Sequence, residues 1–594
     1  MSKFVSQFFY LLGPESRKLP FLILIFLSAS MLDLLGLSLV GPYVALVVAP
    51  EPPDSVLLEI LVKVGIPQEH QILATTLGLA LFAVFGIKAI AAIGIHWAII
   101  RFSQRQQLRL RSYLMQNYQA MPYAAYLRRN SSEYIFNIQV LAGEFSDIVR
   151  AFLRVICDGI VAVVIICLLA VTNVLALLLL VGVLGSVIVG YDRLFRKRMT
   201  EYGLQHNIAN TRLIQAAQEG VTGFKEVRVF GCQDYFLKKV QDNARRAKYY
   251  QERKLVTQQA PWYLFEWTIV TFIVLLVIGA PLLGGDINSL VPTLGIFGVA
   301  GLRLVSLANT LSTSLVLLRF SKDKMTRLCD DLRVLDELGT PKLNVSEESA
   351  ANSLNPELST EKFQLLTIRD LSYRYPKARV NALNGISMEV FSGESIGVVG
   401  RSGAGKTTLV DVLLGLLEPE TESITFNNRP LQSKLKEWHS QVAYLPQEVF
   451  LMDDTLKRNV ALGVLDSAID EVLLRDALIR ARLDEVVQHL PSGIDTTIGE
   501  DGARLSGGQR QRVALARAFY HQRSVLVMDE STSALDNETE KEIIEEIKIL
   551  KGEITLIVIA HRFTTVEHCD RIYRLEHGRV VSHGRPEDVL SPIR

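Results

Sequence analysis

The chain has 594 residues, of which 49% are hydrophobic, and its mean hydropathy is +0.25. This composition is too apolar for an ordinary soluble protein, and the length leaves room for more than one domain. The net charge of +1 gives no reason to expect a nucleic-acid partner.

The apolar residues are concentrated before residue 320, in six spans. Each span is long enough to cross a hydrocarbon layer of about 30 Å, which takes about 20 helical residues. Buried soluble helices would imitate one such span but not six. Only Val171-Thr-Asn173 separates the third span from the fourth, so we expect a tight turn there. The six spans are 21–48, 73–100, 150–170, 173–193, 262–283 and 290–318.

Basic residues predict the orientation of these spans. The stretch 101–150 holds seven Arg and 194–255 is rich in Lys and Arg, whereas 51–72 holds four acids and one Lys. Loops rich in Lys and Arg stay on the cytoplasmic side of a membrane. We therefore expect a multi-pass protein of the cell membrane, with both termini in the cytoplasm.

Three charged residues lie inside the predicted spans. Lys88 in the second span and Arg303 in the sixth have similar expected depths, and Asp33 lies at a comparable depth in the first span. A buried cation costs about 2.5–3.5 kcal/mol on insertion scales, so these side chains need a partner. Two alternatives remain open: the cations face a wet cavity and bind an anionic substrate, or they pair internally with Asp33.

The external loop 50–72 is predicted to contain a helix over 54–65 with a wide apolar face that includes Leu57, Leu58 and Leu61. Such a helix lies flat on the outer bilayer surface, or it caps its own membrane helices. On the cytoplasmic side, helical extensions are expected over 102–118, 197–219 and 236–251. The polar composition of 339–362 predicts a linker between a membrane domain (1–338) and a second domain (363–594).

The second domain begins with a phosphate-binding pattern. Gly400-Arg-Ser-Gly-Ala-Gly-Lys-Thr-Thr408 fits G-x-x-x-x-G-K-[ST], between a predicted strand over 395–399 and a predicted helix over 406–417. Backbone N–H groups of such a loop converge on phosphate oxygens. Lys406 supplies a charge for the outer phosphates, and the Thr407 hydroxyl is a Mg²⁺ ligand. The pattern predicts binding of ATP with Mg²⁺.

A second motif narrows the family. Leu505-Ser-Gly-Gly-Gln509, followed by Arg510-Gln-Arg-Val-Ala-Leu-Ala-Arg517, resembles the signature of ABC (ATP-binding cassette) ATPases. In that family the signature donates to a phosphate held by another subunit, through a serine and N–H groups at a helix start. The resemblance implies an ATP site made from the following residues: Gly400, Arg401, Ser402, Gly403, Ala404, Gly405, Lys406, Thr407, Thr408, Ser506, Gly507, Gly508 and Gln509.

Further residues match the family's order. The apolar strand before Asp529-Glu530 predicts that Asp529 holds Mg²⁺ and that Glu530 polarises the attacking water. Gln447 resembles the family's glutamine that senses Mg²⁺ and water, so the expected metal ligands are Thr407, Gln447 and Asp529. His561 resembles the switch histidine that contacts the γ-phosphate. The remaining matches are Ser533–Asp536, which resembles the inter-subunit loop, and Tyr375, which competes with Tyr373 for the position that stacks on adenine.

The resemblance implies a fold of six membrane helices, all α, followed by an α/β P-loop ATPase domain. One membrane domain fused to one cassette is the layout of exporter-type half-transporters. The segments 130–136 and 220–230 resemble their coupling helices, the second of which usually docks into the partner's cassette. A chain with its own Glu530, signature and His561 is expected to pair with itself, although a related half-transporter is an alternative partner.

The cations in the spans and the external helix resemble features of bacterial flippases for lipid-linked oligosaccharides. In that family, basic cavity residues meet a pyrophosphate and the external helix meets a polyprenyl tail. The implied function is ATP-driven flipping of an amphipathic glycolipid. Two alternatives remain open: export of peptides, lipids or drug-like compounds, and a membrane ATPase that acts as a regulator or ATP-gated channel.

Overall fold

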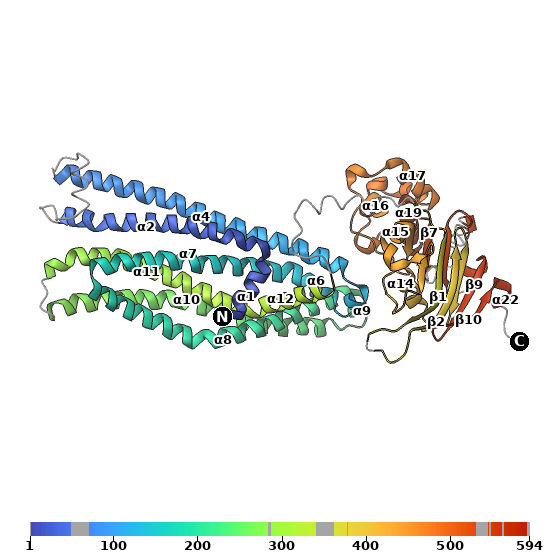
Figure 1. Cartoon of the computed structure of the whole chain (residues 1–594), viewed down its shortest axis with the longest axis horizontal. Helices are drawn as coiled ribbons and strands as arrows, with labels where there is room; N and C mark the ends of the chain where they lie inside the picture. Colours follow the sequence, from blue (N-terminus) through green and yellow to red (C-terminus); the bar gives the residue numbers. More distant parts are fainter. Residues whose placement is uncertain are drawn as a thin grey trace. The chain divides into compact units, whose positions relative to one another are not determined.

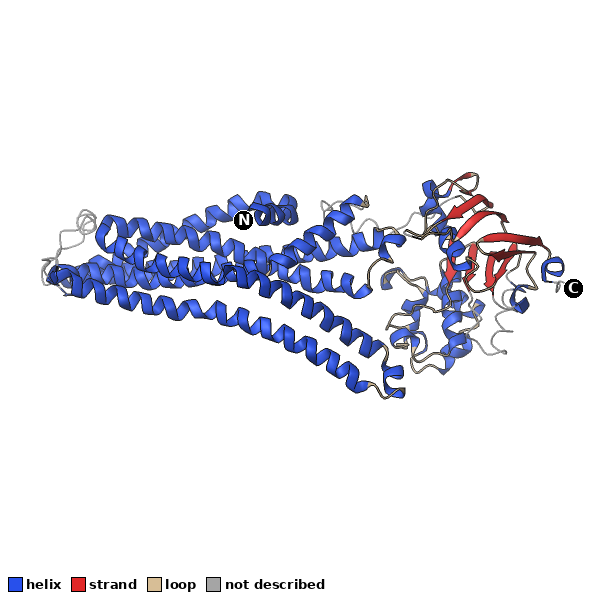
Figure 2. Ribbon diagram, turned by 90° about the horizontal axis from the view of Figure 1, so that it is seen from below, coloured by secondary structure: helices blue, strands red, loops and turns tan. Residues whose placement is uncertain are grey.

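The computed structural model describes residues 2–48, 70–282, 287–339, 361–529 (without 377), 545, 548–549, 551–560 and 563–590. The chain divides into two compact units. The membrane unit comprises Met1–Met121 and Arg129–Ser346, and the cassette unit comprises Pro122–Arg128 and Glu347–Arg594. In the described residues the strands belong to the cassette unit, and the membrane unit is helical (Figure 2).

Long helices that run side by side make up the described part of the membrane unit (Figure 1). The predicted spans fall on these helices, to within one residue at the ends. Within the described residues, four stretches are long and apolar enough to cross a membrane: Ala74–Ala120, Ser131–Thr172, Val174–Thr222 and Phe297–Phe320. The long helices are α2 (Leu19–Val48), α4 (His70–Ala120), α7 (Ala142–Thr172), α8 (Val174–Thr222), α10 (Gln233–Leu282) and α11 (Ile287–Phe320).

The turn predicted between the third and fourth spans is confirmed. α7 ends at Thr172 and α8 begins at Val174, and Asn173 between them has an extended backbone. The Asn173 side chain accepts a hydrogen bond from the Ala176 N–H (3.0 Å), which caps α8. One residue thus reverses the chain between two membrane helices.

The predicted helical extensions are also confirmed. α8 has 49 residues, so it is about 73 Å long, more than twice the thickness of a hydrocarbon layer. α4 and α10 are of similar length. The short helix α9 (Phe224–Val229) lies within the predicted segment 220–230.

The predicted segment 130–136 forms a short helix, α6. α6 (Ser131–Phe136) belongs to the membrane unit and leads into α7, and its Tyr134 and Phe136 are buried there. The piece of this loop that joins the cassette unit is Pro122–Arg128, which contains α5 (Tyr123–Tyr126). Tyr123 packs against the apolar core of the cassette. The apolar side chains of α6 therefore help to fill the core of the membrane unit.

Two shorter helices complete the described membrane unit. α1 (Ser2–Leu12) continues through a 3₁₀ turn (Gly13–Lys18), and α12 (Lys322–Glu337) follows α11. α12 is tied to the bundle by polar contacts along its length. Lys324 pairs with Glu144 of α7 (2.6 Å), and Asp331 binds Arg129 and the Tyr118 hydroxyl.

The cassette unit contains a six-stranded sheet and a four-stranded sheet. The strand order of the large sheet is β10-β9-β3-β8-β7-β6, in which β9, β3, β8, β7 and β6 run parallel. These strands are β3 (Ser395–Gly400), β6 (Val442–Leu445), β7 (Val525–Asp529), β8 (Thr555–Ala560), β9 (Arg571–Glu576) and β10 (Arg579–Gly584). The small antiparallel sheet contains β1 (Leu365–Tyr373), β2 (Leu383–Phe391), β4 (Ile424–Phe426) and β5 (Arg429–Pro430).

The parallel strands bring distant parts of the sequence to one edge. Val399 at the end of β3 pairs with Ala560 at the end of β8, and Ile559 pairs with Asp529 at the end of β7. β6 ends beside β7, because Leu445 pairs with Met528. Ligands of open parallel sheets bind at this carboxyl edge.

Helices flank both sheets. The helix after β3, α14 (Lys406–Leu413), is shorter than the predicted 406–417, because Gly415 adopts a left-handed backbone (φ 70°) that ends it. The others are α15 (Leu435–Gln441), α16 (Leu456–Val460), α17 (Glu471–Arg480), α18 (Asp484–His489), α19 (Gly507–Tyr520), α21 (Phe563–Val566) and α22 (Pro586–Leu590).

Candidate functional site

The phosphate loop connects β3 to α14. Its lysine, Lys406, is 5% exposed, and its ammonium donates to the Gly400 carbonyl (3.0 Å) and reaches the Arg401 carbonyl (3.5 Å). The charge therefore lies inside the curve of the loop. α14 begins directly behind it, so the N–H groups of its first turn point toward the same place.

Glycines give this loop its shape. Gly403 and Gly405 have φ of 78° and 100°, a region that L side chains rarely adopt. A Cβ on Gly405 would also lie 2.8 Å from the Ala382 carbonyl oxygen. The loop is thus a backbone cradle around a buried ammonium, which fits a polyphosphate. Arg401, Ser402 and Thr407 are exposed at its surface.

Two carboxylates face each other beside the cradle. Asp529, the last residue of β7, is 6% exposed and accepts a hydrogen bond from the Tyr444 hydroxyl (3.4 Å). Asp411 lies one turn beyond Thr407 on α14. Burial and, second, the negative charge of Asp529 raise the pKa of Asp411 to about 6. A paired acidic patch of oxygen ligands next to a phosphate cradle fits Mg²⁺.

The predicted metal ligand Gln447 follows β6. Its backbone carbonyl, with that of Pro446, accepts from the Gln511 amide of α19 (3.1 and 3.2 Å). Gln511 is buried, so this contact fixes the loop after β6 against the helix that follows the signature.

Tyr375 and Tyr373 were the two candidates for adenine stacking. Tyr373 is 7% exposed and belongs to the core of the cassette, whereas Tyr375 is half-buried. The Tyr375 hydroxyl lies 3.2 Å from the Thr408 hydroxyl, which places its ring beside the phosphate loop. The two rings meet edge to face at 5.2 Å. Of the pair, Tyr375 is the one that a nucleotide can reach.

The signature forms the start of α19. The Ser506 hydroxyl accepts from the Gln509 N–H (3.2 Å), and the Gln509 side chain accepts from the Ser506 N–H (2.9 Å). This is a capping box, and it leaves the N–H groups of Gly507 and Gly508 at the helix start as donors. The Gln509 amide thus shapes the loop. The signature and the phosphate loop are anchored in different apolar clusters of the cassette, the signature through Leu505 and the phosphate loop through Ala404.

Some predicted residues fall outside the described part of the chain. These are Glu530, His561, the segment Ser533–Asp536 and the external helix 54–65. In the membrane unit, the same holds for the side chain of Asp33.

The two basic residues predicted inside the spans, Lys88 and Arg303, lie on α4 and α11. Lys88 lies over the Phe85 ring, 4.8 Å from its centroid. Arg303 of α11 and Arg154 of α7 each lie near His96 of α4. Sequence reasoning missed His96 and Arg154. Their position inside the spans 73–100 and 150–170 was the available signal.

The fold and site define a class of protein: a multi-pass membrane protein with a P-loop ATPase fused behind its helices. The model of the ABC transporter transmembrane region matches residues 51–297, and the ABC transporter ATPase model matches residues 383–533. The chain belongs to the ABC transporter family, as its motifs predicted. It hydrolyses ATP, with Mg²⁺ as cofactor, and couples the reaction to transport.

Two similar proteins are named ATP-dependent lipid A-core flippase. The one from Cupriavidus pinatubonensis is 30% identical over 513 residues, which cover 85% of this chain and 84% of the relative. The one from Saccharophagus degradans is 30% identical over 486 residues, or 79% of this chain and 77% of the relative. The structure of a bacterial Atm1-family ABC exporter with ATP bound superposes with a TM-score of 0.69 at 21% identity, covering 97% of this chain and 96% of that one. This likeness supports the exporter fold. Half-transporters of the ABC exporter type function as dimers.

Proposed function

We propose that two copies of this chain form an ATP-driven flippase that moves an amphipathic glycolipid from the inner to the outer leaflet. A lipid-linked oligosaccharide or a related glycolipid is the best candidate. The observation that carries the proposal is the presence of two arginines inside the predicted spans, Arg154 on α7 and Arg303 on α11. The names of the similar flippases support a glycolipid as the substrate class.

The position of these cations suits a lipid headgroup. His96 and Arg154 each lie four residues from the cytoplasmic end of a predicted span, about 6 Å along a helix. Both side chains are exposed on the single chain, and Arg303 is half-buried. Cations at this depth are costly unless an anion or water meets them. A phosphate on an inner-leaflet lipid would meet them there.

The roles of the ATP-site residues belong to the same proposal. The loop from Gly400 to Thr408 holds the phosphates, and Tyr375 stacks on the adenine. Thr407, Gln447 and Asp529 hold Mg²⁺, which neutralises charge on the phosphates. Glu530 and Gln447 orient the attacking water, and His561 contacts the γ-phosphate. Ser506, Gly507, Gly508 and Gln509 of one copy close the site of the other.

Homodimer formation is supported by the tip of the α8–α10 pair. Val221, Phe224, Val229 and Phe230 are between 59% and 82% exposed around α9. So much apolar surface on one short helix and its flanks is typical of an interface. We assign its partner as the cassette of the second copy. Both cassettes and both termini then lie in the cytoplasm, and the bacterial inner membrane is the expected location.

The test is flipping of a lipid-linked glycan, and separately of a phosphorylated glycolipid, in proteoliposomes. We expect Arg154→Gln/Arg303→Gln to lose transport while basal ATP hydrolysis survives, because ATP chemistry needs only the cassettes. Lys88→Gln is measured beside the double variant, so that the contribution of Lys88 is distinguished from that of Arg154 and Arg303. Arg245→Gln is the matched control, because Arg245 has a 76% exposed side chain on the cytoplasmic extension. Full transport by the double variant would remove the anionic headgroup from the proposal.

A further inference from the structure

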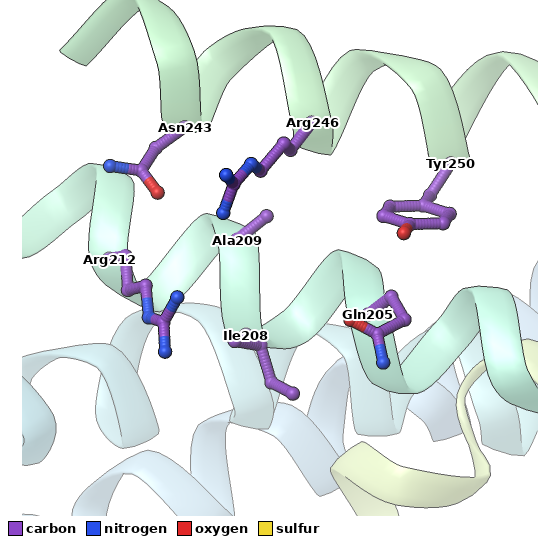
Figure 3. A pocket seen from close by; sticks show the side chains of 7 residues that line it. All are labelled: Gln205, Ile208, Ala209, Arg212, Asn243, Arg246 and Tyr250. Atoms are coloured by element: carbon purple, nitrogen blue, oxygen red, sulfur yellow. The ribbon is translucent and has the colours of Figure 1, made fainter. Parts of the chain in front are cut away.

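A pocket of about 190 Å³ opens between the cytoplasmic extensions of α8 and α10. Figure 3 shows its lining residues, which α8 and α10 share. Arg212 comes from α8 and Arg246 from α10, so two guanidinium groups border one space. The other lining residues are Gln205, Ile208, Ala209, Asn243 and Tyr250.

No lining residue is acidic, although acids lie within two turns on the same helices. Each of these acids has another partner. Glu201 accepts from Gln205 (2.9 Å), and Glu219 binds Lys239. On α10, Asp242 lies 4.0 Å from Arg245, and Glu252 lies 3.4 Å from Lys248. Within the described residues, neither pocket arginine has an ion pair with them. Two like charges without a counterion repel, and an anion between them removes that repulsion.

The remaining polar groups suit a phosphate ester. The Asn243 amide nitrogen donates to the Lys239 carbonyl (2.8 Å) and that of Gln205 donates to Glu201, so their carbonyl oxygens are left as acceptors for hydroxyl groups. The Tyr250 hydroxyl is a further donor, and its ring rests 5.9 Å from that of Tyr202. Guanidinium groups recognise phosphate through paired hydrogen bonds.

We propose that this pocket binds a phosphate-bearing, hydroxyl-rich anion through Arg212 and Arg246. The pocket is separate from His96, Arg154 and Arg303, none of which lines it. Residues 205–212 lie 12–19 residues beyond the predicted membrane end at residue 193, about 18–28 Å along α8. Residues 243–250 lie equally far before the span that begins at 262. The phosphate comes from a soluble molecule or from a long headgroup, and the position favours the soluble source.

The experiment uses the full-length protein in nanodiscs and hydrogen exchange read by mass spectrometry. Inorganic pyrophosphate is titrated into phosphatidylcholine discs, and protection is followed in peptides that cover 205–212 and 243–250. Site-resolved protection separates this pocket from the phosphate loop at 400–408, which also binds pyrophosphate. In a second arm, discs contain phosphatidic acid and no pyrophosphate. Protection in the first arm assigns a soluble source, and protection only in the second assigns a headgroup.

We expect Arg212→Gln and Arg246→Gln each to weaken pyrophosphate binding at least tenfold, about 1.4 kcal/mol. Arg212→Lys should lose less, because it keeps the charge without the paired donors. Arg245→Gln, one residue away on α10 and outside the pocket lining, should bind as the wild type does. Basal ATP hydrolysis reports that each variant is folded. No protection of the peptides 205–212 and 243–250 in either arm, or equal binding by Arg212→Gln and the wild type, would overturn the proposal without touching the proposed flippase activity.

Discussion

The ion pair between Lys324 and Glu144 makes a quantitative prediction about how the membrane unit holds α12. Lys324 is 3% exposed, and its ammonium lies 2.6 Å from the Glu144 carboxylate on α7. With an effective dielectric constant of about 20, the attraction at this distance is about 6 kcal/mol, before the cost of removing both ions from water. Breaking such a pair from one side usually costs about 3–5 kcal/mol.

We expect Lys324→Met to destabilise the membrane unit by about 3 kcal/mol, because it leaves the Glu144 carboxylate behind. The expected loss is at the lower end of the usual range of about 3–5 kcal/mol, because the Glu144 side chain is 25% exposed and Lys254 lies near it. Glu144→Leu should cost more, about 4 kcal/mol, because Lys324 and Lys254 then repel each other without that acid. In Glu144→Leu/Lys324→Met both charges are replaced by apolar groups, so its stability should lie within about 1 kcal/mol of the wild type.

The measurement is the free energy of unfolding from equilibrium denaturation in mixed micelles near neutral pH. The control is Arg333→Met on the same helix. Arg333 pairs with Asp330 at 3.6 Å, but these side chains are 56% and 62% exposed, so we expect a change below about 0.5 kcal/mol. If the losses of the two single variants simply add in the double variant, the two residues are not coupled and the reasoning fails.

Three further outcomes are expected. Gly203→Ala should lower the melting temperature sharply, since its Cβ would lie 2.0 Å from the Phe320 carbonyl oxygen, whereas Gly190→Ala meets nothing within 4 Å and should be tolerated. Burial and, second, the charge of Lys324 lower the pKa of His206 to about 4, while Glu144 opposes and Lys254 adds to this effect. Between these two pKa values the unfolded chain binds more protons than the folded chain. The contribution of His206 to stability is therefore complete above about pH 6.5, and it falls by about 2 kcal/mol, allowing for partial exposure, as the pH drops toward 4. His206→Gln should flatten this loss in a pH series of melting curves. Lys406→Ala should weaken ATP binding by about 1.5–3 kcal/mol in equilibrium titrations, and an unchanged Kd would remove Lys406 from the site.

Sequence patterns predicted the features that depend on local chemistry. Apolar spans, the turn at Asn173 and the phosphate loop follow from short stretches read alone, and the structure has them. The fold class was predictable for the same reason, because each motif also implies the strand or helix beside it. The described cassette has the expected strand ends at one edge of the sheet.

Features that depend on distant contacts were not predictable in the same way. The burial of Tyr134 and Phe136 in the membrane unit was not predictable, because periodicity does not tell which partner buries an apolar face. Arg154 and Arg303 come near His96 only after three helices pack, which no single stretch of sequence predicts. The pairing of Asp411 with Asp529 is of the same kind, since β7 and α14 are far apart in sequence.

The cassette unit contains a chain of contacts between the acidic edge of the ATP site and a piece of the membrane-domain loop. Tyr444 donates to Asp529, and both Asp529 and Asp411 act on the Tyr444 hydroxyl. Tyr123 of α5 is half-buried against the same region, where desolvation first and the charge of Asp411 second raise its pKa. A cation held by Asp529 would reduce the negative potential at Asp411 and Tyr444, and through them at Tyr123. The segment Pro122–Arg128 follows α4 in the sequence and belongs to the cassette unit, so Tyr123 is the residue of this loop at which we expect a change in charge at Asp411 and Asp529 to be felt.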